Sequence, residues 1–168
     1  MYFQSFQQMK KILGQINTWL DKAAEHAKTR SFDGAVYATF RLAPDQLAFA
    51  RQIQIACDTA KLGAARLTGK DGPSNADTEV TLDDFRARIA STVGFLDTLT
   101  EKDFAESATR VITQPRWEGK TMTGHDYFVE HVTPNFYFHA THIYALLRHN
   151  GVPLGKKDYL GALSQKLP

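Results

Sequence analysis

The stretch that decides the fold is the N-terminal segment of residues 2–27, YFQSFQQMKKILGQINTWLDKAAEHA. Its apolar residues recur at alternating spacings of four and three, through Tyr2, Phe6, Met9, Leu13, Ile16, Leu20, Ala23 and Ala27. This spacing predicts one long amphipathic helix with a continuous apolar stripe. A stripe of this length needs partner helices of similar length, which favours a helical bundle.

The chain that follows predicts a second helix from Pro44 to Thr68. Proline is favoured in the first turn of a helix, and Asp45 next to it suits the positive end of the helix dipole. One face of this helix is apolar and rich in alanine, so that another helix can approach closely. Its members are Phe49, Ile53, Ala56, Cys57, Ala60, Ala64 and Leu67. A second stripe is polar and consists of Arg51, Gln54, Asp58 and Lys61.

Two more helices complete the pattern. Thr81, followed three residues later by Asp84, is a variant of the capping box that opens a third helix. The last helix spans about residues 125–149, must kink or divide at Pro134, and stops at Asn150-Gly151. Between these two helices, residues 111–113 and 120–122 predict a small hairpin. We therefore predict an all-α fold, a four-helix bundle in one domain of residues 1–168, with a small hairpin before the last helix.

Composition excludes several classes of protein. Twenty Lys and Arg against eighteen Asp and Glu give a net charge of +2, without the basic stripe of a nucleic-acid binder. No run approaches the ~18 apolar residues of a membrane span, and no signal peptide is visible. The single cysteine, Cys57, cannot form an internal disulfide. We expect a cytoplasmic protein with neither nucleic acid nor membrane as partner.

Histidine is the unusual residue of this composition, because five of the six lie between His125 and His149. With about 100° per residue and His131 as the origin, Asn135 lies at roughly 40° and His142 at roughly 20°. His139 follows at roughly 80° and His149 at roughly 0°. The spacings of three and four allow two such side chains to meet one ion or one substrate. The expected opposite wall is the polar stripe of the second helix.

A plainer interpretation stands beside this one. Histidines at the boundary between core and water are often hydrogen-bonded and inert, and His149 suits the negative end of the helix dipole. A catalytic zinc site needs three protein ligands and an open position, which these histidines alone do not provide. Cys57 lies among alanines, as an inert buried thiol would.

Two stretches carry a family resemblance. One is Arg41-Leu-Ala-Pro-Asp45 leading into Arg51-Gln-Ile-Gln-Ile-Ala-Cys-Asp58. The other is Pro134-Asn-Phe-Tyr-Phe-His139, which runs into residues 147–155 (LRHNGVPLG) and 157–161 (KDYLG). Through these words the chain resembles the DUF1993 family from end to end. That family is assigned to the DinB/YfiT-like superfamily of four-helix bundles, so the resemblance implies this fold; the function of the family itself is uncharacterised.

The wider superfamily implies a metal site, from which this chain departs. Metal-binding members carry one histidine on the second helix and an H-x-x-x-H pattern on the last. By this resemblance His139 takes the second histidine position, Asn135 takes the first, and His142 falls where a glutamine is usual. Residues 44–68 contain no histidine. The metal-assisted thiol transfer or hydrolysis of the superfamily therefore lacks two of its three ligands here.

Two hypotheses for function follow. The first is an enzyme or small-molecule binder with a polar pocket between helices, in which Asp58 or His139 is the acid or base. Its ligand would be held by Arg51, Gln54, Asn135 and His142. A divalent metal, Zn or Ni, would take His139, His142 and Asp58 as ligands. The second is a non-catalytic structural or interaction module that has lost the metal site. The apolar stripe of the first helix is a candidate surface for a homodimer, since bundle relatives often self-associate.

Overall fold

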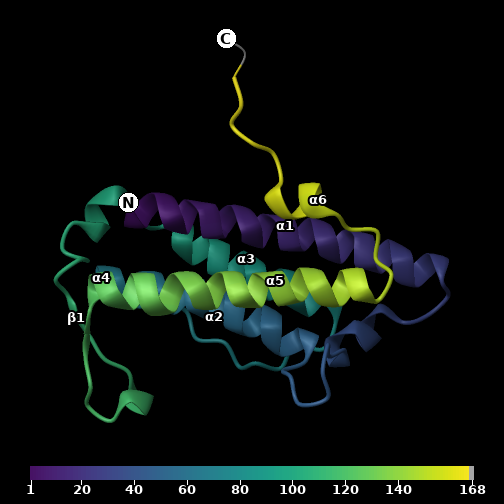
Figure 1. Cartoon of the computed structure of the whole chain (residues 1–168), viewed down its shortest axis with the longest axis horizontal. Helices are drawn as coiled ribbons and strands as arrows, with labels where there is room; N and C mark the ends of the chain where they lie inside the picture. The colour runs from purple at the N-terminus through teal and green to yellow at the C-terminus, as the bar shows by residue number, and fades with distance from the viewer. Residues whose placement is uncertain (167–168) are drawn as a thin grey trace.

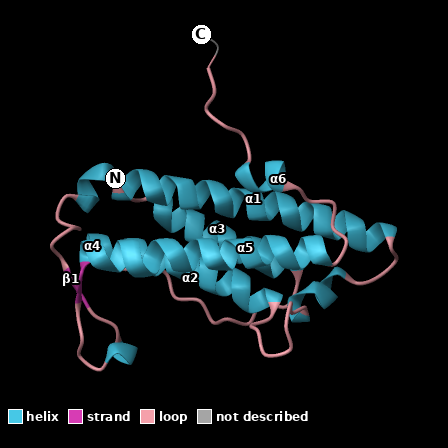
Figure 2. Ribbon diagram, in the orientation of Figure 1, coloured by secondary structure: helices cyan, strands magenta, loops and turns pink. Residues whose placement is uncertain are grey.

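The computed structural model describes residues 1–166 and is built mainly of helices (Figures 1 and 2). The four long ones are α1 (Tyr2–Thr29), α2 (Phe49–Thr68), α3 (Leu82–Asp97) and α5 (Thr133–His149). Short helical segments are η1 (Gly34–Thr39), η2 (Glu101–Phe104), η3 (Pro115–Trp117), α4 (Gly124–Asp126) and α6 (Lys156–Leu160). A π-helical segment, η4 (Tyr127–Val132), joins α4 to α5 without a break. The all-α bundle predicted from the apolar spacing is confirmed.

The four long helices pack in a closed ring. α1 packs against α3, α3 against α2, α2 against α5, and α5 against α1, with the α2–α5 contact the most extensive. In Figure 1, α1 (purple) and α5 (green to yellow) lie along the near side, with α3 and α2 behind them. Among residues 1–166, no helix combines the length and apolarity needed to cross a membrane.

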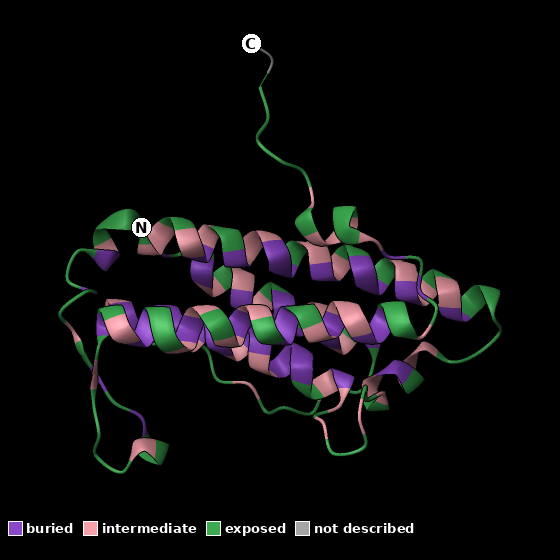
Figure 3. Cartoon of the chain, in the orientation of Figure 1, coloured by how far each residue is buried: buried purple, intermediate pink, exposed green. Residues whose placement is uncertain are grey.

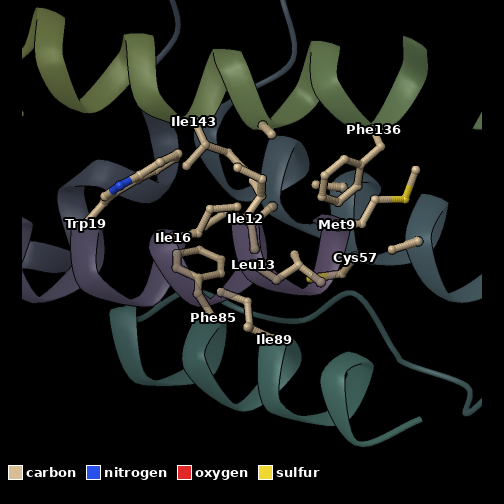
Figure 4. Close-up of a cluster of buried hydrophobic side chains, with 14 of the residues drawn as sticks. Met9, Ile12, Leu13, Ile16, Trp19, Cys57, Phe85, Ile89, Phe136 and Ile143 are labelled. Carbon is tan, nitrogen blue, oxygen red and sulfur yellow. The ribbon is translucent and has the colours of Figure 1, made fainter. Parts of the chain in front are cut away.

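The apolar stripe of α1 forms the centre of the core. Its residues from Phe6 to Ala27 are buried, and Tyr2 at its start is half-buried. The buried faces of the helices point inward in Figure 3, and Figure 4 shows side chains of α1, α3 and α5 meeting there. Because the stripe is used within one chain, it is not available as the surface for self-association that its length suggested. Self-association itself stays a prediction.

Helix ends follow the local signals, with one exception. Thr81 and Asp84 form the expected capping box at the start of α3, and Gly151 adopts a positive φ of 92° just after α5. The prediction of Pro44 in the first turn of the second helix is wrong, because α2 begins at Phe49. Pro44 lies instead in a turn closed by the N–H of Gln46, which donates to the Ala43 carbonyl at 3.0 Å.

The interruption expected at Pro134 takes the form of a wider turn. Within the π-helical segment η4 the N–H of Thr133 donates to the carbonyl of Phe128, five residues back. A proline has no N–H and cannot continue the usual four-residue ladder. The helix therefore widens before Pro134 and runs on as α5, and it is not divided there.

The predicted hairpin is present between α3 and α4. Strand β1 (Val111–Ile112) pairs antiparallel with β2 (Met122–Thr123). Its connection contains η3 and turns at Glu118 and Gly119, with φ angles of 53° and 86°. The hairpin returns to the bundle at Gly124, where a Cβ atom would lie 1.8 Å from the carbonyl oxygen of Ser107. Glycine is thus required at the base of the hairpin.

Replacing this glycine tests the close approach. We expect Gly124→Ala to lower the free energy of unfolding by about 3 kcal/mol, because the backbone around Ser107 must move. The matched control is Gly94→Ala on α3, where a Cβ would meet nothing within 4 Å. The control should raise the free energy of unfolding by up to about 1 kcal/mol through helix propensity. Urea unfolding of both variants measures the difference, and equal stabilities would contradict the contact.

Candidate functional site

The polar residues expected to form one pocket lie in separate places. Those of the α2 stripe face α3 and the loop of residues 69–81. At the centre lies Arg88 of α3, whose side chain is 1% exposed. Its guanidinium donates to Asp58 Oδ1 at 2.8 Å, to Asp77 Oδ1 at 2.8 Å and to Glu79 Oε1 at 2.9 Å. Asp58 is therefore committed to an ion pair between α2 and α3.

The rest of the α2 stripe ties down the same loop. Arg51 bonds to Asp77 at 2.8 Å, and Gln54 donates to Glu79 at 2.8 Å. Lys61, which is buried, donates to Asn75 at 2.7 Å and pairs with Asp58 at 2.8 Å. Together with Arg88 these residues form what we call the loop network. Its contacts hold a loop without regular structure against two helices, and that is a structural task.

The loop network sets the pKa values of its acids. Burial raises the pKa of Asp77, but hydrogen bonds from Arg51 and Arg88 and their positive charges outweigh it. The pKa of Asp77 therefore lies below that of an ordinary aspartate. Burial raises the pKa of Glu79 as well, but hydrogen bonds from its own backbone, Gln54 and Arg88 outweigh burial. The pKa of Glu79 is therefore also lowered. Both carboxylates are ionised wherever the fold is intact and the pH is near neutral.

The polar residues of α5 have partners of their own. Asn135 donates to the hydroxyl of Thr59 on α2 at 2.7 Å. His139, 6% exposed, has its Nδ1 2.7 Å from Oε1 of Gln52 on α2. His142 lies outside this contact, with its Nδ1 2.7 Å from the carbonyl oxygen of Phe138. Burial, the nearby His142 and the charge of Arg51 lower the pKa of His139 to about 4, so its imidazole is neutral at pH 7.

The three side chains expected as ligands do not fit the metal site that the resemblance implies. Across residues 1–166, no three His, Cys, Asp or Glu side chains are grouped so as to hold a metal ion. His139, His142 and Asp58 are engaged with Gln52, with the Phe138 carbonyl, and with Arg88 and Lys61, respectively. The ligand set expected from the sequence is thus not assembled.

A pocket does exist between α2 and the η4–α5 helix, with η3 at its edge. It has a volume of about 330 Å³. Its lining is partly apolar, through Ile55, Leu62 and Pro115. The polar lining consists of Asp58, Thr59, Arg66, Gln114, Arg116, Tyr127, His131 and Asn135. Asp58 and Asn135 are the predicted site residues among these.

Two arginines reach the same pair of rings in this pocket. Arg66 of α2 donates through Nη1 to the hydroxyl of Tyr127 at 2.8 Å. Arg116 of η3 has its Nη2 3.1 Å from Nε2 of His131, which accepts when the imidazole is neutral. Burial, and then the charges of Arg116 and Arg66, lower the pKa of His131. Burial raises the pKa of Tyr127 despite both arginines, so it stays protonated.

The walls of the pocket are held by close packing. Val132 is fully buried, and its Cγ1 lies 2.8 Å from where a Cβ on Gly63 would stand. This glycine, which follows the lining residue Leu62, lets α2 approach η4 closely beside the pocket. Trp117 packs its ring edge-to-face on Tyr127, with centroids 5.9 Å apart, and so connects η3 to η4. Gln114, 7% exposed, lines the pocket and its Nε2 has no partner among residues 1–166.

Two other hollows on the molecule are weaker candidates for a ligand site. The hollow between α1, η1 and α3 has about 450 Å³, but Arg86 in its lining is paired with Asp21 and Asp83. Another of about 470 Å³ is lined by His26, Arg30, Phe32, Val36, Phe40, Asn150 and Gly151, with Arg30 as its arginine. We therefore take the α2–α5 pocket as the candidate site.

Sequence patterns named some of the residues of this pocket. Of the predicted arc of His131, Asn135, His139, His142 and His149, His131 and Asn135 line the pocket, while His139, one turn further on, is buried against α2. Arg66 follows Thr59 by seven residues and so shares its face of α2, a signal that was open to sequence reasoning. Gln114 and Arg116 reach the pocket through the hairpin, which no local pattern places.

A solved structure defines the class of protein. The crystal structure of a DinB family member protein from Shewanella denitrificans is 50% identical in sequence and superposes with a TM-score of 0.94. The match covers 97% of this chain and 93% of that chain. The chain is therefore a DinB-type helical bundle.

The family follows from a second comparison. The model of the family described as "Domain of unknown function (DUF1993)" matches residues 1–160, so the chain belongs to the DUF1993 family. The resemblance noted in the sequence is confirmed. A comparison with curated proteins found no match.

The loop network predicts a strong effect of its central arginine. Arg88→Met should lower the free energy of unfolding by about 3 kcal/mol, because Asp58, Asp77 and Glu79 lose their shared partner. Arg86→Met on the same helix is the control, since its partners are exposed and the loss should stay below about 1 kcal/mol. Chemical denaturation at pH 7 measures both.

Acid provides a second readout of the same network. Carboxylates whose pKa is lowered by folding stabilise above their unfolded pKa, and that stability is lost as the pH falls through the folded pKa. The wild type should therefore lose stability below about pH 4, an effect that Arg88→Met flattens. Equal acid sensitivity of wild type and variant would contradict the network.

The His139 contact predicts an unusual titration. Its ring should protonate with a midpoint at about pH 4. The unfolded chain binds this proton near pH 6.5, so the free energy of unfolding should fall as the pH drops from about 6.5 to 4. NMR of the ring Cε1–H follows the midpoint, and a His139→Asn variant assigns the signal. A midpoint above pH 6 would show that the ring is not buried against Gln52.

Proposed function

We propose that this DUF1993 protein binds a small molecule in the pocket between α2 and the η4–α5 helix. The observation that carries the proposal is the convergence of Arg66, Arg116, His131 and the buried amide of Gln114 on one pocket of about 330 Å³. Pockets for small ligands have volumes of roughly 300–1,000 Å³ and combine an apolar lining with a few polar groups. The mixed lining of this pocket agrees with that description.

A comparison with the loop network supports binding over a purely structural role. In the loop network each carboxylate meets a cationic side chain, so charge is satisfied within the fold. In the pocket, Arg66 and Arg116 have no carboxylate within 4.0 Å among residues 1–166, so their positive charge is not matched within the fold. A bound ligand would supply the missing partner.

We assign ligand binding to this pocket and no chemical step. Asp58 lines the pocket but is held in ion pairs with Arg88 and Lys61. His139, the other candidate acid or base, is bonded to Gln52 and is not part of the lining. The two residues that the sequence offered as alternatives for the acid or base, Asp58 and His139, therefore lie in different environments.

Filling the pocket tests the proposal. Leu62→Trp places a large ring in the lining, whereas Val80→Trp adds the same ring at a position that is 61% exposed in the loop. Benzoate, benzamide and benzamidine at millimolar concentrations serve as probes, with binding followed by amide NMR shifts. We expect at least one probe to shift signals of Thr59, His131 and Asn135 in wild type and Val80→Trp, and not in Leu62→Trp.

Circular dichroism establishes that both variants are folded before the comparison. Probe shifts that persist unchanged in Leu62→Trp, or that map to another surface, would contradict the assignment of this pocket. Absence of any shift with all three probes would also count against it.

A further inference from the structure

We propose that the natural ligand of this pocket carries an anionic group, a carboxylate or a phosphate, bound by Arg66 and Arg116. This inference rests on the proposed function, since it names the chemistry of what the same pocket binds. It is carried by the balance of charge in the lining and by the positions of the two guanidinium groups.

The charge balance of the lining is positive. Neither Arg66 nor Arg116 has a carboxylate within 4.0 Å among residues 1–166, in contrast to Arg51, Arg86 and Arg88. The acidic side chain of the lining is Asp58, and its charge is met by Arg88 and Lys61. Two cations thus face the pocket while its acid is already compensated. A bound anion would complete the ion pairing.

The donors of Arg66 are arranged for a further acceptor. Its bond to the hydroxyl of Tyr127 uses one N–H of the guanidinium, which has five. The bond also fixes the side chain, whose Cζ lies 5.9 Å from the centre of the Tyr127 ring. A fixed guanidinium binds carboxylate or phosphate oxygens with two parallel hydrogen bonds at little further loss of freedom.

The second arginine reaches the pocket from the hairpin. Arg116 lies on η3 and contacts Nε2 of His131 on η4. Trp117 beside it packs on both Tyr127 and His131, with ring centroids 5.9 and 6.3 Å apart, respectively. Tyr127, which Arg66 contacts, lies next to His131, which Arg116 contacts, with ring centroids 5.4 Å apart, so both arginines reach the same part of the pocket lining.

The charge state of His131 links the anion to an independent signal. Tyr127, Arg66 and Arg116 face this imidazole, and the two arginines disfavour its protonated form. A negative charge bound between them would offset that effect and raise the pKa of His131. Cationic ligands would lower it further.

Three probes that share a ring and differ in charge separate the possibilities. Benzoate is anionic, benzamide is neutral and benzamidine is cationic. We expect benzoate to bind at least about tenfold more tightly than the other two, by the strength of charge-assisted hydrogen bonds. Phenyl phosphate compared with benzoate then shows whether the anionic group is a phosphate or a carboxylate. The measurements are NMR titrations of the full chain.

Variants of single arginines show which guanidinium groups bind the anionic group of the ligand. Arg116→Met should weaken benzoate binding about tenfold, and because Arg116 is exposed the fold is not at risk. Arg66→Met should do the same, and Arg66→Lys should restore part of the affinity by restoring the charge. The control is Arg148→Met on α5, an exposed arginine 13 residues after Asn135, or about 20 Å further along the helix. It should leave benzoate binding unchanged.

The outcomes separate this inference from the proposed function. Preference for benzoate, its loss in the arginine variants and a rise of the His131 pKa on binding support both. Benzamide or benzamidine binding in the pocket as tightly as benzoate, with sensitivity to Leu62→Trp, overturns the anionic ligand and retains the binding function. Equal loss of benzoate binding in Arg148→Met would also overturn it, because the effect would then be one of net charge. Absence of all binding overturns both.

Discussion

The close contact between α2 and the helix formed by α4, η4 and α5 governs both the core and the candidate site. Gly63 has no side chain, and Val132 fills the space where a Cβ would stand. Alanines such as Ala60 and Ala64, both fully buried, continue this narrow face along α2. Protein interiors are close-packed, so a spacing set at one turn constrains the neighbouring turns. The polar groups on either side of the contact must pair across it or face water.

That constraint explains why the polar residues at the α2–α5 interface form hydrogen-bonded pairs. His139 pairs with Gln52, and Asn135 pairs with Thr59, each across the same interface. Burying a polar group without a partner is costly, whereas a hydrogen-bonded pair is tolerated and specifies how two helices align. Asn135 and His139, the positions at which the resemblance implied metal ligands, are engaged in such pairs. Proximity on one helical face therefore brought His131 and Asn135 to one pocket but left His139 in a contact of its own.

Helices were predictable because their signals are local. The apolar spacing of α1, the capping box at Thr81 and the glycine stop after α5 each depend on residues a few positions apart. The partners of the polar stripe of α2 could not be predicted in this way, because Asp77 and Glu79 lie in a loop whose path depends on the tertiary fold. For the same reason, the residues that the hairpin contributes to the pocket could not be predicted from the sequence. Arg116 reaches it through a hairpin more than 40 residues away from α2 in sequence.

The two polar regions of α2 show how one helix can serve two purposes. On the side of α3, the fold supplies three carboxylates to one buried guanidinium, so that the charge is compensated internally. On the side of η4, the fold brings two guanidinium groups to Tyr127 and His131, and neither has a carboxylate within 4.0 Å in the described part of the chain, residues 1–166. Uncompensated like charges repel one another, which opposes folding. An external anion would compensate the charges of Arg66 and Arg116, and for that reason we propose a ligand at the η4 side of α2 and assign the charges at the α3 side to structure.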